Sequence, residues 1–265
     1  MRQFSKCSLV TPTYNWPEAL NLLLKSVLNQ THLPDEVIIA DDGSTEETTK
    51  LIKTFQDKFP IPLIHIKHED KGNRKPRIMN KAIAKARHDY IIEIDGDIIM
   101  HPEFIKDHLR FAKKGQYLYG SRVNIQKEFL PDLFSKEKIT FNYFSKGIKK
   151  RGRTLHLPLL TRLYKPVEKR SRKLRGCNMS FWREDFVKVN GFNEELVGWG
   201  IDDSEMIQRL HNIGLVGKRL KFAGIVYHIY HKEQSKSHIE VNLEIERQAE
   251  REELKTIKKG VSQFL

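Results

Sequence analysis

The sequence has few cysteines and no long apolar run, and each absence narrows the class of protein. Cys7 and Cys177 are the only cysteines among 265 residues, so a disulfide framework is excluded and a reducing, cytoplasmic setting is expected. No stretch approaches the roughly 18 consecutive apolar residues of a membrane span, and the N-terminus lacks the apolar core of a secretory signal. No internal repeat or Gly/Ser-rich linker divides the chain. With 39% hydrophobic residues, the sequence predicts one globular unit with a substantial core.

Positive charge is abundant, and most of it lies in one segment. The chain carries 47 Lys and Arg against 34 Asp and Glu, a formal charge of +13. Residues 145–175 hold 12 of these cations and one acid, Glu168, which gives that segment a charge of +11. Nucleic acid is disfavoured as a partner, because neither a recognised motif nor interleaved aromatic residues accompany the charge. We expect either a solvated loop or a surface that meets a polyanion, such as an anionic membrane or a charged acceptor.

The first 120 residues alternate between strand and helix patterns. Short apolar runs predict five strands, at 8–13, 36–42, 63–66, 90–95 and 117–120. Asn15 is a candidate N-cap for the first intervening helix, and Ser44 with Glu47 forms a capping-box pattern for a second helix that reaches about Phe59. Strands separated by helices imply parallel βαβ units. The predicted fold is therefore α/β, with a mostly parallel central sheet flanked by helices.

The second half has a different organisation. After the basic segment the chain predicts one strand, at 222–228, and then a charged stretch at 238–259 with a weak apolar stripe. This stretch is interpreted as a surface or membrane-flanking helix. We expect a single domain over 1–235, in which a basic variable segment (121–175) joins the halves 1–120 and 176–235. A charged C-terminal helix is expected over 236–265.

Acidic residues follow two of the predicted strands, at the edge where parallel sheets bind ligands. In Asp95-Gly96-Asp97, two carboxylates separated by one small residue can face a hard divalent cation that also binds phosphate. A plain strand-to-helix turn is the alternative. Asp41 and Asp42 are adjacent like charges that raise each other's pKa. We expect Asp41 to accept hydrogen bonds from a donor-rich ligand such as a nucleobase and ribose, while Asp42 caps the next helix.

Several motifs in order resemble a known family. VTPTYNWPEALNLLLKSVLNQT, VIIADDGSTEET and IIEIDGDIIMHPEFI resemble the family 2 glycosyltransferases of the GT-A fold, which are inverting enzymes that use nucleotide-diphosphate sugars. RGCNMSFWREDFVKVNGFNEELVGWGIDDSEMIQRL resembles the carboxyl-terminal region shared with galactosyltransferase and N-acetylgalactosaminyltransferase families. The resemblance covers about residues 7–120 and 175–232. It implies a Rossmann-like GT-A fold, with the nucleotide sugar on 1–120 and the acceptor and catalytic groups on 176–235.

The resemblance also implies roles for individual residues on the donor side. The nucleotide is expected to contact the strand ends and the segment GNRKPRIMN, through Pro12, Tyr14, Asn15, Asp41, Arg74, Lys75, Arg77, Asp95 and Gly96, with Asn80 nearby. Asp97, with Asp95 beside it, is the expected ligand of a Mn²⁺ or Mg²⁺ ion. A histidine of VYHIYHKE is expected to complete this metal site, and His231 is preferred over His228. A histidine ligand favours Mn²⁺.

The segment GWGIDDSE resembles the family's tryptophan–glycine loop followed by two acids. The second acid, Asp203, is the expected catalytic base, and Asp202 is the alternative. Sugar contacts are expected from Trp199, Gly200 and Asn178, although Trp199 suits a partly buried core position equally. The sequence departs from the family pattern at Asp202, where Glu is common, and at Ile201, where Gly is common. A carboxylate base opposite the leaving group implies single displacement with inversion.

The expected function is metal-dependent, inverting transfer of a hexosyl or N-acetylhexosaminyl group from a nucleotide-diphosphate sugar, with UDP as the expected nucleotide. A glycan or lipid-linked acceptor is expected, in surface polysaccharide or lipopolysaccharide synthesis on the cytoplasmic face of the membrane. Two alternatives remain. A nucleotidyltransferase needs a Gly-rich basic loop after the first strand, whereas this chain has PTYNWPEA there. A non-catalytic nucleotide-sugar- or polyanion-binding module would bind its ligand without transferring or hydrolysing a sugar.

Overall fold

The computed structural model of the chain describes residues 4–171, 174, 176–196, 198, 200–232 and 238–265. Within these residues the strands form two sheets, a seven-stranded sheet ordered β10-β6-β9-β4-β1-β2-β3 and a four-stranded sheet ordered β5-β11-β7-β8. The larger sheet consists of β1 (Cys7–Thr13), β2 (Glu36–Asp41), β3 (Leu63–Lys67), β4 (Tyr90–Ile94), β6 (Gln116–Gly120), β9 (Asn178–Trp182) and β10 (Val216–Leu220). The smaller sheet consists of β5 (Ile98–Met100), β7 (Arg122–Ile125), β8 (Ile148–Lys149) and β11 (Val226–His228).

The larger sheet is mostly parallel, as predicted. Strands β1, β2, β3 and β4 run in one direction, and β6 pairs in parallel with β10. The exception is β9, which comes from the second half of the chain and lies antiparallel between β4 and β6. All five side chains of β9 are buried, as expected for a strand in the middle of a sheet covered on both faces.

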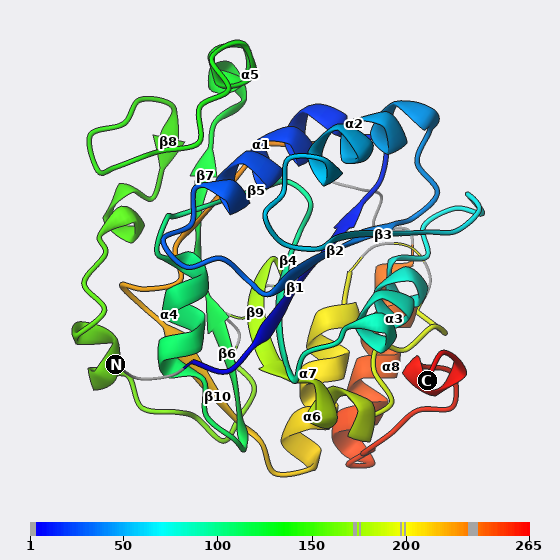
Figure 1. Cartoon of the computed structure of the whole chain (residues 1–265). Helices are drawn as coiled ribbons and strands as arrows, with labels where there is room; N and C mark the ends of the chain where they lie inside the picture. The colour runs from blue at the N-terminus through cyan, green and yellow to red at the C-terminus, as the bar shows by residue number, and fades with distance from the viewer. Residues whose placement is uncertain (1–3, 172–173, 175, 197, 199, 233–237) are drawn as a thin grey trace.

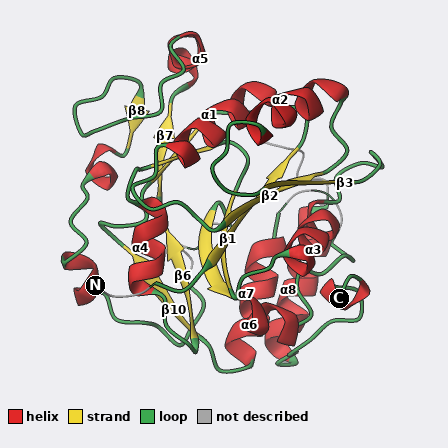
Figure 2. Ribbon diagram, in the orientation of Figure 1, coloured by secondary structure: helices red, strands yellow, loops and turns green. Residues whose placement is uncertain are grey.

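Helices cover both faces of the larger sheet (Figures 1 and 2). One face packs against α1 (Pro17–Leu28), α2 (Glu46–Gln56) and α4 (Phe104–Phe111), and the other packs against α3 (Lys75–Lys85), α6 (Arg183–Lys188) and α7 (Asp202–Asn212). Successive side chains of β1 show the reason: Leu9 belongs to the first core and Val10 to the second, because side chains alternate across a strand. The short helix α5 (Leu130–Ser135) packs beside the smaller sheet, where a third core forms.

Both predicted helix caps are replaced by a link between two loops. The backbone N–H of Asn15 donates to Ser44 Oγ at 3.0 Å, and Asn15 Oδ1 accepts from the N–H of Thr45 at 2.8 Å. These polar groups are therefore not available to cap their own helices. Helix α1 instead begins at Pro17, and α2 begins at Glu46 and ends at Gln56, before the predicted end at Phe59.

The strand predicted at 222–228 is in fact a turn followed by a short strand. Phe222 (φ 66°) and Gly224 (φ 55°) have positive φ, and β11 starts only at Val226. The N–H of Gly224 donates to the buried carboxylate of Asp107 at 2.9 Å, which fixes the turn. An apolar run carries no signal for such a tertiary contact. The prediction also missed β10, because its central residues, Gly-Lys-Arg, lack the apolar pattern of a buried strand.

The C-terminal helix α8 (Ile239–Arg251) is shorter than predicted and packs against α7. Its buried side chains are Asn242, Glu246 and Ala249. The apolar stripe predicted in this stretch, formed by Leu243, Leu254 and Ile257, is only half-buried. The amide of Asn212 on α7 donates to the carbonyl oxygens of Ala249 and Leu254. The helix is thus a surface element of the domain. In the part of the chain that the structure describes, no helix has both the length and the apolarity to cross a bilayer.

Candidate active site

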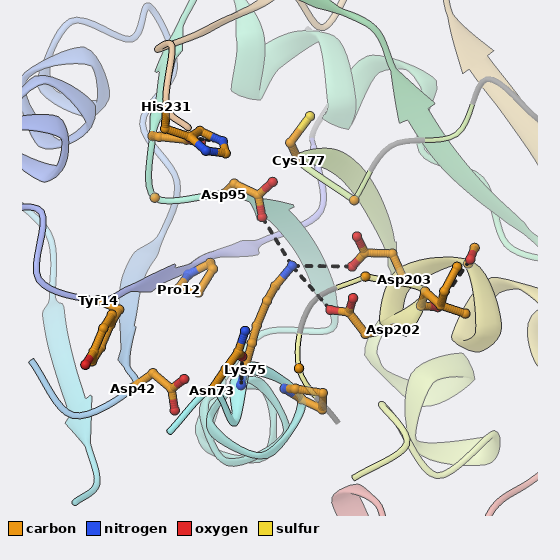
Figure 3. A pocket seen from close by; sticks show the side chains of 18 of the residues that line it. Pro12, Tyr14, Asp42, Asn73, Lys75, Asp95, Cys177, Asp202, Asp203 and His231 are labelled. Carbon is orange, nitrogen blue, oxygen red and sulfur yellow. Dashed lines mark hydrogen bonds and ion pairs between the residues drawn. The ribbon is translucent and has the colours of Figure 1, made fainter. Parts of the chain in front are cut away.

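A cavity of about 700 Å³ opens at the predicted rim of the larger sheet. The carboxyl ends of β1, β2 and β4 supply one wall, through Pro12, Tyr14, Asp42 and the segment Asp95–Asp97. The start of α3 brings Lys75 to the opposite wall, beside the first turn of α7. Figure 3 shows Tyr14 and Asp42 on one side of Lys75, and the α7 acids Asp202 and Asp203 on its other side. The prediction that these strand ends converge on one site is confirmed.

Lys75 lies among three carboxylates at the centre of this cavity (Figure 3). Its Nζ is 3.2 Å from Asp95 Oδ1, 3.4 Å from Asp202 Oδ2 and 3.7 Å from Asp203 Oδ1. Burial by itself would lower the pKa of Lys75, but the carboxylates raise that pKa well above its usual range. Burial would likewise raise the pKa of Asp95, and the positive charge of Lys75 lowers it. One permanent cation is therefore shared by three acids, and the local charge is negative.

The pKa of Asp203 is shifted in the opposite direction to that of Asp95. Burial and the adjacent charge of Asp202 raise the pKa of Asp203 to about 7, against the lowering effect of Lys75. Its carboxylate lies directly over Gly176, where an added Cβ would be 1.5 Å from Asp203 Oδ2. A carboxyl group that titrates near neutral pH suits a general base, because it can both hold and release a proton there.

The backbone before Asp202 is strained. Ile201 has φ 79°, in the left-handed region that a β-branched residue rarely adopts. This conformation starts α7 so that Asp202 and Asp203, two of the three acids in its first turn, face the cavity, where they reach Lys75. The sequence already showed the departure, since Ile201 stands where the family pattern has Gly. The structure explains why Gly is common there, because only Gly adopts this φ without strain.

A second cluster combines one acid and two histidines. Asp97 Oδ2 is 3.3 Å from His228 Nε2 and 3.2 Å from His231 Nε2, and the ligand atoms of the three residues all lie within 4.8 Å of one another. Asp97 follows β4, and the histidines lie at the end of β11 and just beyond it. The structure thus brings both histidines to Asp97, whereas the sequence prediction had to choose between them.

The chemistry of this cluster fits a divalent cation. Asp97 Oδ1 is buried and has no hydrogen-bond partner among the described residues. The ring Nδ1 of His231 lies 2.9 Å from the carbonyl oxygen of Lys232, a contact that assigns the proton to Nδ1 and leaves Nε2 as a free ligand atom. Burial and the nearby Arg122 lower the pKa of His228 to about 3, so that ring is neutral. Asp97, His228 and His231 could together hold a metal ion.

Asp41 and Asp42 have the opposite placements to those predicted. Asp41 is fully buried, and its Oδ1 accepts hydrogen bonds from the N–H groups of Gly43 and Ser44 while Oδ2 contacts His65 at 2.8 Å. It therefore forms the turn after β2 and does not line the cavity. Asp42 lines the cavity instead and accepts from the N–H of Arg74 at 2.9 Å. The assignment of Asp41 to a ligand is corrected on this geometry.

Most of the predicted residues in GNRKPRIMN also point elsewhere. Arg77 Nη1 pairs with Glu194 at 2.7 Å, and the buried Asn80 bonds Phe192 and the same Glu194. The guanidinium of Arg74 bonds the carbonyl oxygen of Glu69. None of these three side chains lines the cavity among the described residues, and Lys75 alone of the predicted basic set does so.

The remaining predicted residues divide in the same way. Pro12, Tyr14, Gly96 and Gly200 line the cavity, and an added Cβ at Gly96 would be 2.3 Å from the carbonyl oxygen of Pro12. Asn15 links two loops, as described above. The predicted sugar contact Asn178 is wrong, because this residue is fully buried and bonds His108 and the carbonyl oxygen of Gly224. Trp199 lies outside the described residues.

One cavity residue that sequence reasoning missed is Arg122. It lines the cavity beside Asp95 and Asp97. Burial and the charge of Asp95 raise the pKa of Asp97 to about 7, and the positive charge of Arg122 acts against that rise. Arg122 follows the carboxyl end of β6, which is parallel to β10 at the same edge of the sheet. The rule that ligands bind at the carboxyl ends of parallel strands, applied to one more strand, points to this residue.

The fold is that of solved GT-A glycosyltransferases. The mannosyltransferase PcManGT from Pyrobaculum calidifontis, solved in complex with GDP-Man and Mn²⁺, superposes with a TM-score of 0.61 at 16% identity, over 87% of this chain and 59% of that one. TarS residues 1–349 from Staphylococcus aureus, solved in complex with UDP-GlcNAc, give a TM-score of 0.61 at 18% identity, over 86% and 59%. At these identities the similarity establishes the fold.

The chain belongs to glycosyl transferase family 2. Residues 8–169 match the family described as "Glycosyl transferase family 2", and residues 161–232 match the "N-terminal domain of galactosyltransferase". Among curated relatives, hyaluronan synthase from Pasteurella multocida is 26% identical over 243 residues. That alignment covers 85% of this chain and 24% of the synthase, so the chain spans about a quarter of this relative's length.

Proposed function

We propose that the protein transfers a hexosyl or N-acetylhexosaminyl group from a UDP-sugar to an acceptor hydroxyl, with inversion of the anomeric centre. One observation carries this proposal. The carboxyl group of Asp203, with its pKa raised to about 7, and the Asp97–His228–His231 cluster lie on either side of Asp95 and Lys75, and Asp203, Asp97 and His231 line the same cavity. Figure 3 shows Asp203 and His231 on these two sides. Family membership supplies the reaction class, and the two clusters supply the groups that such a reaction needs.

We place the nucleotide at the end of the cavity formed by Pro12, Tyr14 and Asp42. The Tyr14 hydroxyl donates to Asp70 at 2.9 Å, which holds its half-exposed ring at the cavity mouth, where it can stack on a base. Asp42 takes the role first expected of Asp41 and accepts from a base imide or a ribose hydroxyl. Arg122 is proposed as an additional contact to the diphosphate, because a guanidinium binds phosphate oxygens in a bidentate manner.

We assign the metal site to Asp97, His228 and His231. Two imidazole ligands with one carboxylate favour Mn²⁺ over Mg²⁺, which prefers oxygen ligands alone. A cation held there would neutralise the charge that develops on the departing diphosphate. Asp95 lies between this site and Lys75, and its own contact at 3.2 Å is to the lysine.

Asp203 is proposed as the base that removes the proton from the acceptor hydroxyl. The attacking oxygen then displaces the diphosphate from the opposite face of the sugar ring in one step, and the anomeric configuration inverts. Lys75 holds Asp202 and Asp203 in place through its contacts at 3.4 and 3.7 Å. Asp202 is the alternative base, and Gly200 lies where it can approach a sugar closely.

We propose a glycan or lipid-linked acceptor, in the synthesis of a surface polysaccharide or lipopolysaccharide. The similarity to a hyaluronan synthase supports a polysaccharide product. A cytoplasmic location is supported by the two free, buried cysteines, whose pKa values burial raises to about 12. In this proposal residues 1–120 bind the donor, residues 176–235 supply the base, and the variable segment 121–175 lies beside the acceptor.

A donor screen tests the proposal. The protein is incubated with UDP- and GDP-sugars with and without Mn²⁺, and thermal stabilisation and sugar hydrolysis or transfer are measured for each. We expect Mn²⁺-dependent stabilisation by one or a few UDP-sugars and slow turnover of the same donor. Asp97→Asn should weaken donor binding, while Asp132→Asn, an exposed acid on α5, should behave as wild type. Binding without any turnover would instead identify a non-catalytic nucleotide-sugar-binding module.

A further inference from the structure

Residues 143–169, which include β8 and the chain after it, expose an unusual number of large apolar side chains. Leu159 and Leu163 are 73% and 75% exposed, and Phe144 is 85% exposed. Leu155, Leu157 and Leu160 are also exposed. Together with the cations between them, these side chains form what we call the apolar-basic face, residues 143–169. Scattered exposed leucines are ordinary on a protein surface, but five within nine residues are not.

This face is anchored to the domain, in contrast to a loose solvated loop. The N–H of Leu157 donates to the carbonyl oxygen of Phe222 at 2.9 Å, and Thr161 Oγ1 donates to the carbonyl oxygen of Lys221 at 2.6 Å. Val167 forms a β-bridge with Gly217 on β10. Two short 3₁₀ helices, η2 (Arg151–Thr154) and η3 (Leu160–Leu163), shape the segment between these contacts. Its leucines are thus held outward by the fold.

Cations are interspersed with the exposed leucines. Arg162, Lys165 and Lys169 are exposed and have no carboxylate partner in the described part of the chain, whereas Arg170 at the border pairs with Glu246 at 3.2 Å. A small cavity of about 80 Å³ lies beside η2, and its polar lining comes from Ser121, Arg153, Arg219 and Lys221. The Nε of Arg219 is buried and has no hydrogen-bond partner among the described residues. Such donors suit a phosphate group.

We propose that the apolar-basic face binds the surface of an anionic phospholipid bilayer. The exposed leucines and Phe144 enter the headgroup–acyl boundary, the cations contact anionic headgroups, and the small cavity accepts one headgroup phosphate. A second copy of this chain is a poor occupant, because pairing this face with itself would oppose two segments of charge +11. A soluble polyanion would use the cations but leave the leucines in water.

The geometry connects this surface with the proposed reaction. Ser121 lines the small cavity, and its chain neighbour Arg122 lines the catalytic cavity. The far border of the basic segment also reaches the catalytic cavity, through Arg170 and Leu174. A protein bound in this way would present its acceptor side to the membrane. Membrane binding itself needs neither donor nor turnover, so it stands or falls separately from the proposed transferase activity.

Vesicle sedimentation without any nucleotide sugar tests the proposal. The full chain is mixed with vesicles of phosphatidylcholine alone or of equal parts phosphatidylcholine and phosphatidylglycerol, at low and high salt. We expect recovery with the anionic vesicles only, and a decrease at high salt. Arg162→Gln/Lys165→Gln should weaken binding about 30-fold, since each cation near an anionic surface contributes about 1 kcal/mol and 1.4 kcal/mol corresponds to tenfold. Lys50→Gln/Lys53→Gln, which removes the same charge from α2 at the far end of the sheet, should bind as wild type.

The leucines provide the decisive variant. Leu159→Ser/Leu163→Ser should weaken binding at least about tenfold, because both side chains leave water on insertion. Both are exposed, so the variant should unfold at the wild-type temperature and keep its activity toward a soluble acceptor. The matched control, Val241→Ser/Leu265→Ser, removes side chains that are 64% and 62% exposed elsewhere. Equal binding to neutral and anionic vesicles, an unaffected leucine variant, or lipid-free self-association lost in that variant would each overturn the proposal.

Discussion

Replacing Asp203 by Asn should abolish catalysis and at the same time stabilise the protein at alkaline pH. The amide keeps the shape of the carboxyl group but cannot accept the acceptor's proton, and loss of a positioned general base reduces the rate by about 10²–10⁴. Nucleotide binding should persist, because Asp97, His228 and His231 are unchanged. For the wild-type enzyme, the rate should rise with pH through about 7, as Asp203 loses its proton.

The effect on stability follows from the raised pKa of Asp203. The pKa of Asp203 is about 7 in the folded protein and 3.8 for an aspartate in water, so between these pH values the folded state holds a proton that the unfolded state has released. Wild-type stability therefore falls as pH rises from about 4 to 7 and is then constant with respect to this group. At about 1.4 kcal/mol per pH unit, ionising Asp203 costs about 3 kcal/mol between pH 5 and pH 8. Asn at this position never ionises and escapes that cost.

Urea unfolding of wild type and Asp203→Asn at pH 5 and pH 8 measures this difference, with Asp132→Asn as the control for an exposed acid. The difference in free energy of unfolding between the variant and wild type should increase by about 3 kcal/mol from pH 5 to pH 8. An advantage that is the same at both would refute the electrostatic argument. Near-normal turnover of the variant would show that Asp203 is not the base and would make Asp202 the candidate.

Three further perturbations test other parts of the site. Gly176→Ala should reduce kcat by at least about tenfold with little change in nucleotide affinity by calorimetry, because its Cβ would displace the Asp203 carboxylate. Ile201→Gly should raise the free energy of unfolding in urea by about 0.5–1 kcal/mol, since it relieves a left-handed backbone that costs about 1–2 kcal/mol; an unchanged or lower free energy of unfolding would show no strain there. Chelation with EDTA should abolish donor-dependent thermal stabilisation, and Mn²⁺ should restore it; stabilisation that survives EDTA would remove the metal from the proposal.

The position of the site in the sheet could be predicted from the sequence. Which individual side chains face the site was predicted less well. The parallel strands of the first half and the edge of the sheet at which their carboxyl ends lie followed from apolar runs and helix spacing. Asp41 and Asp42 were exchanged because a buried strand carries no mark of its last residue, and moving that end by one residue turns the side chain to the other face. His228 and His231 both reach Asp97 because β11 ends at His228, so strand alternation no longer separates them.

The error at α3 could have been avoided from the sequence. Residues three apart on a helix share a face, so Arg77 and Asn80 point the same way, and both contact Glu194. Lys75 is two residues before Arg77 and therefore points to a different side, toward the cavity. By contrast, no local signal identifies the turn at Phe222, because it depends on a hydrogen bond to Asp107 from a distant helix.

The position of β9 constrains the order in which this protein can fold. The strand lies between β4 and β6, although it follows β6 by more than 50 residues in the chain. During synthesis, the first 120 residues can pair β1 with β2 and β4, and β2 with β3, but β4 and β6 keep open edges until residue 182 has left the ribosome. Open edges of apolar strands are prone to aggregation. The basic segment 145–175 is made in this interval, and its like charges would oppose contact between neighbouring nascent chains while the sheet is incomplete.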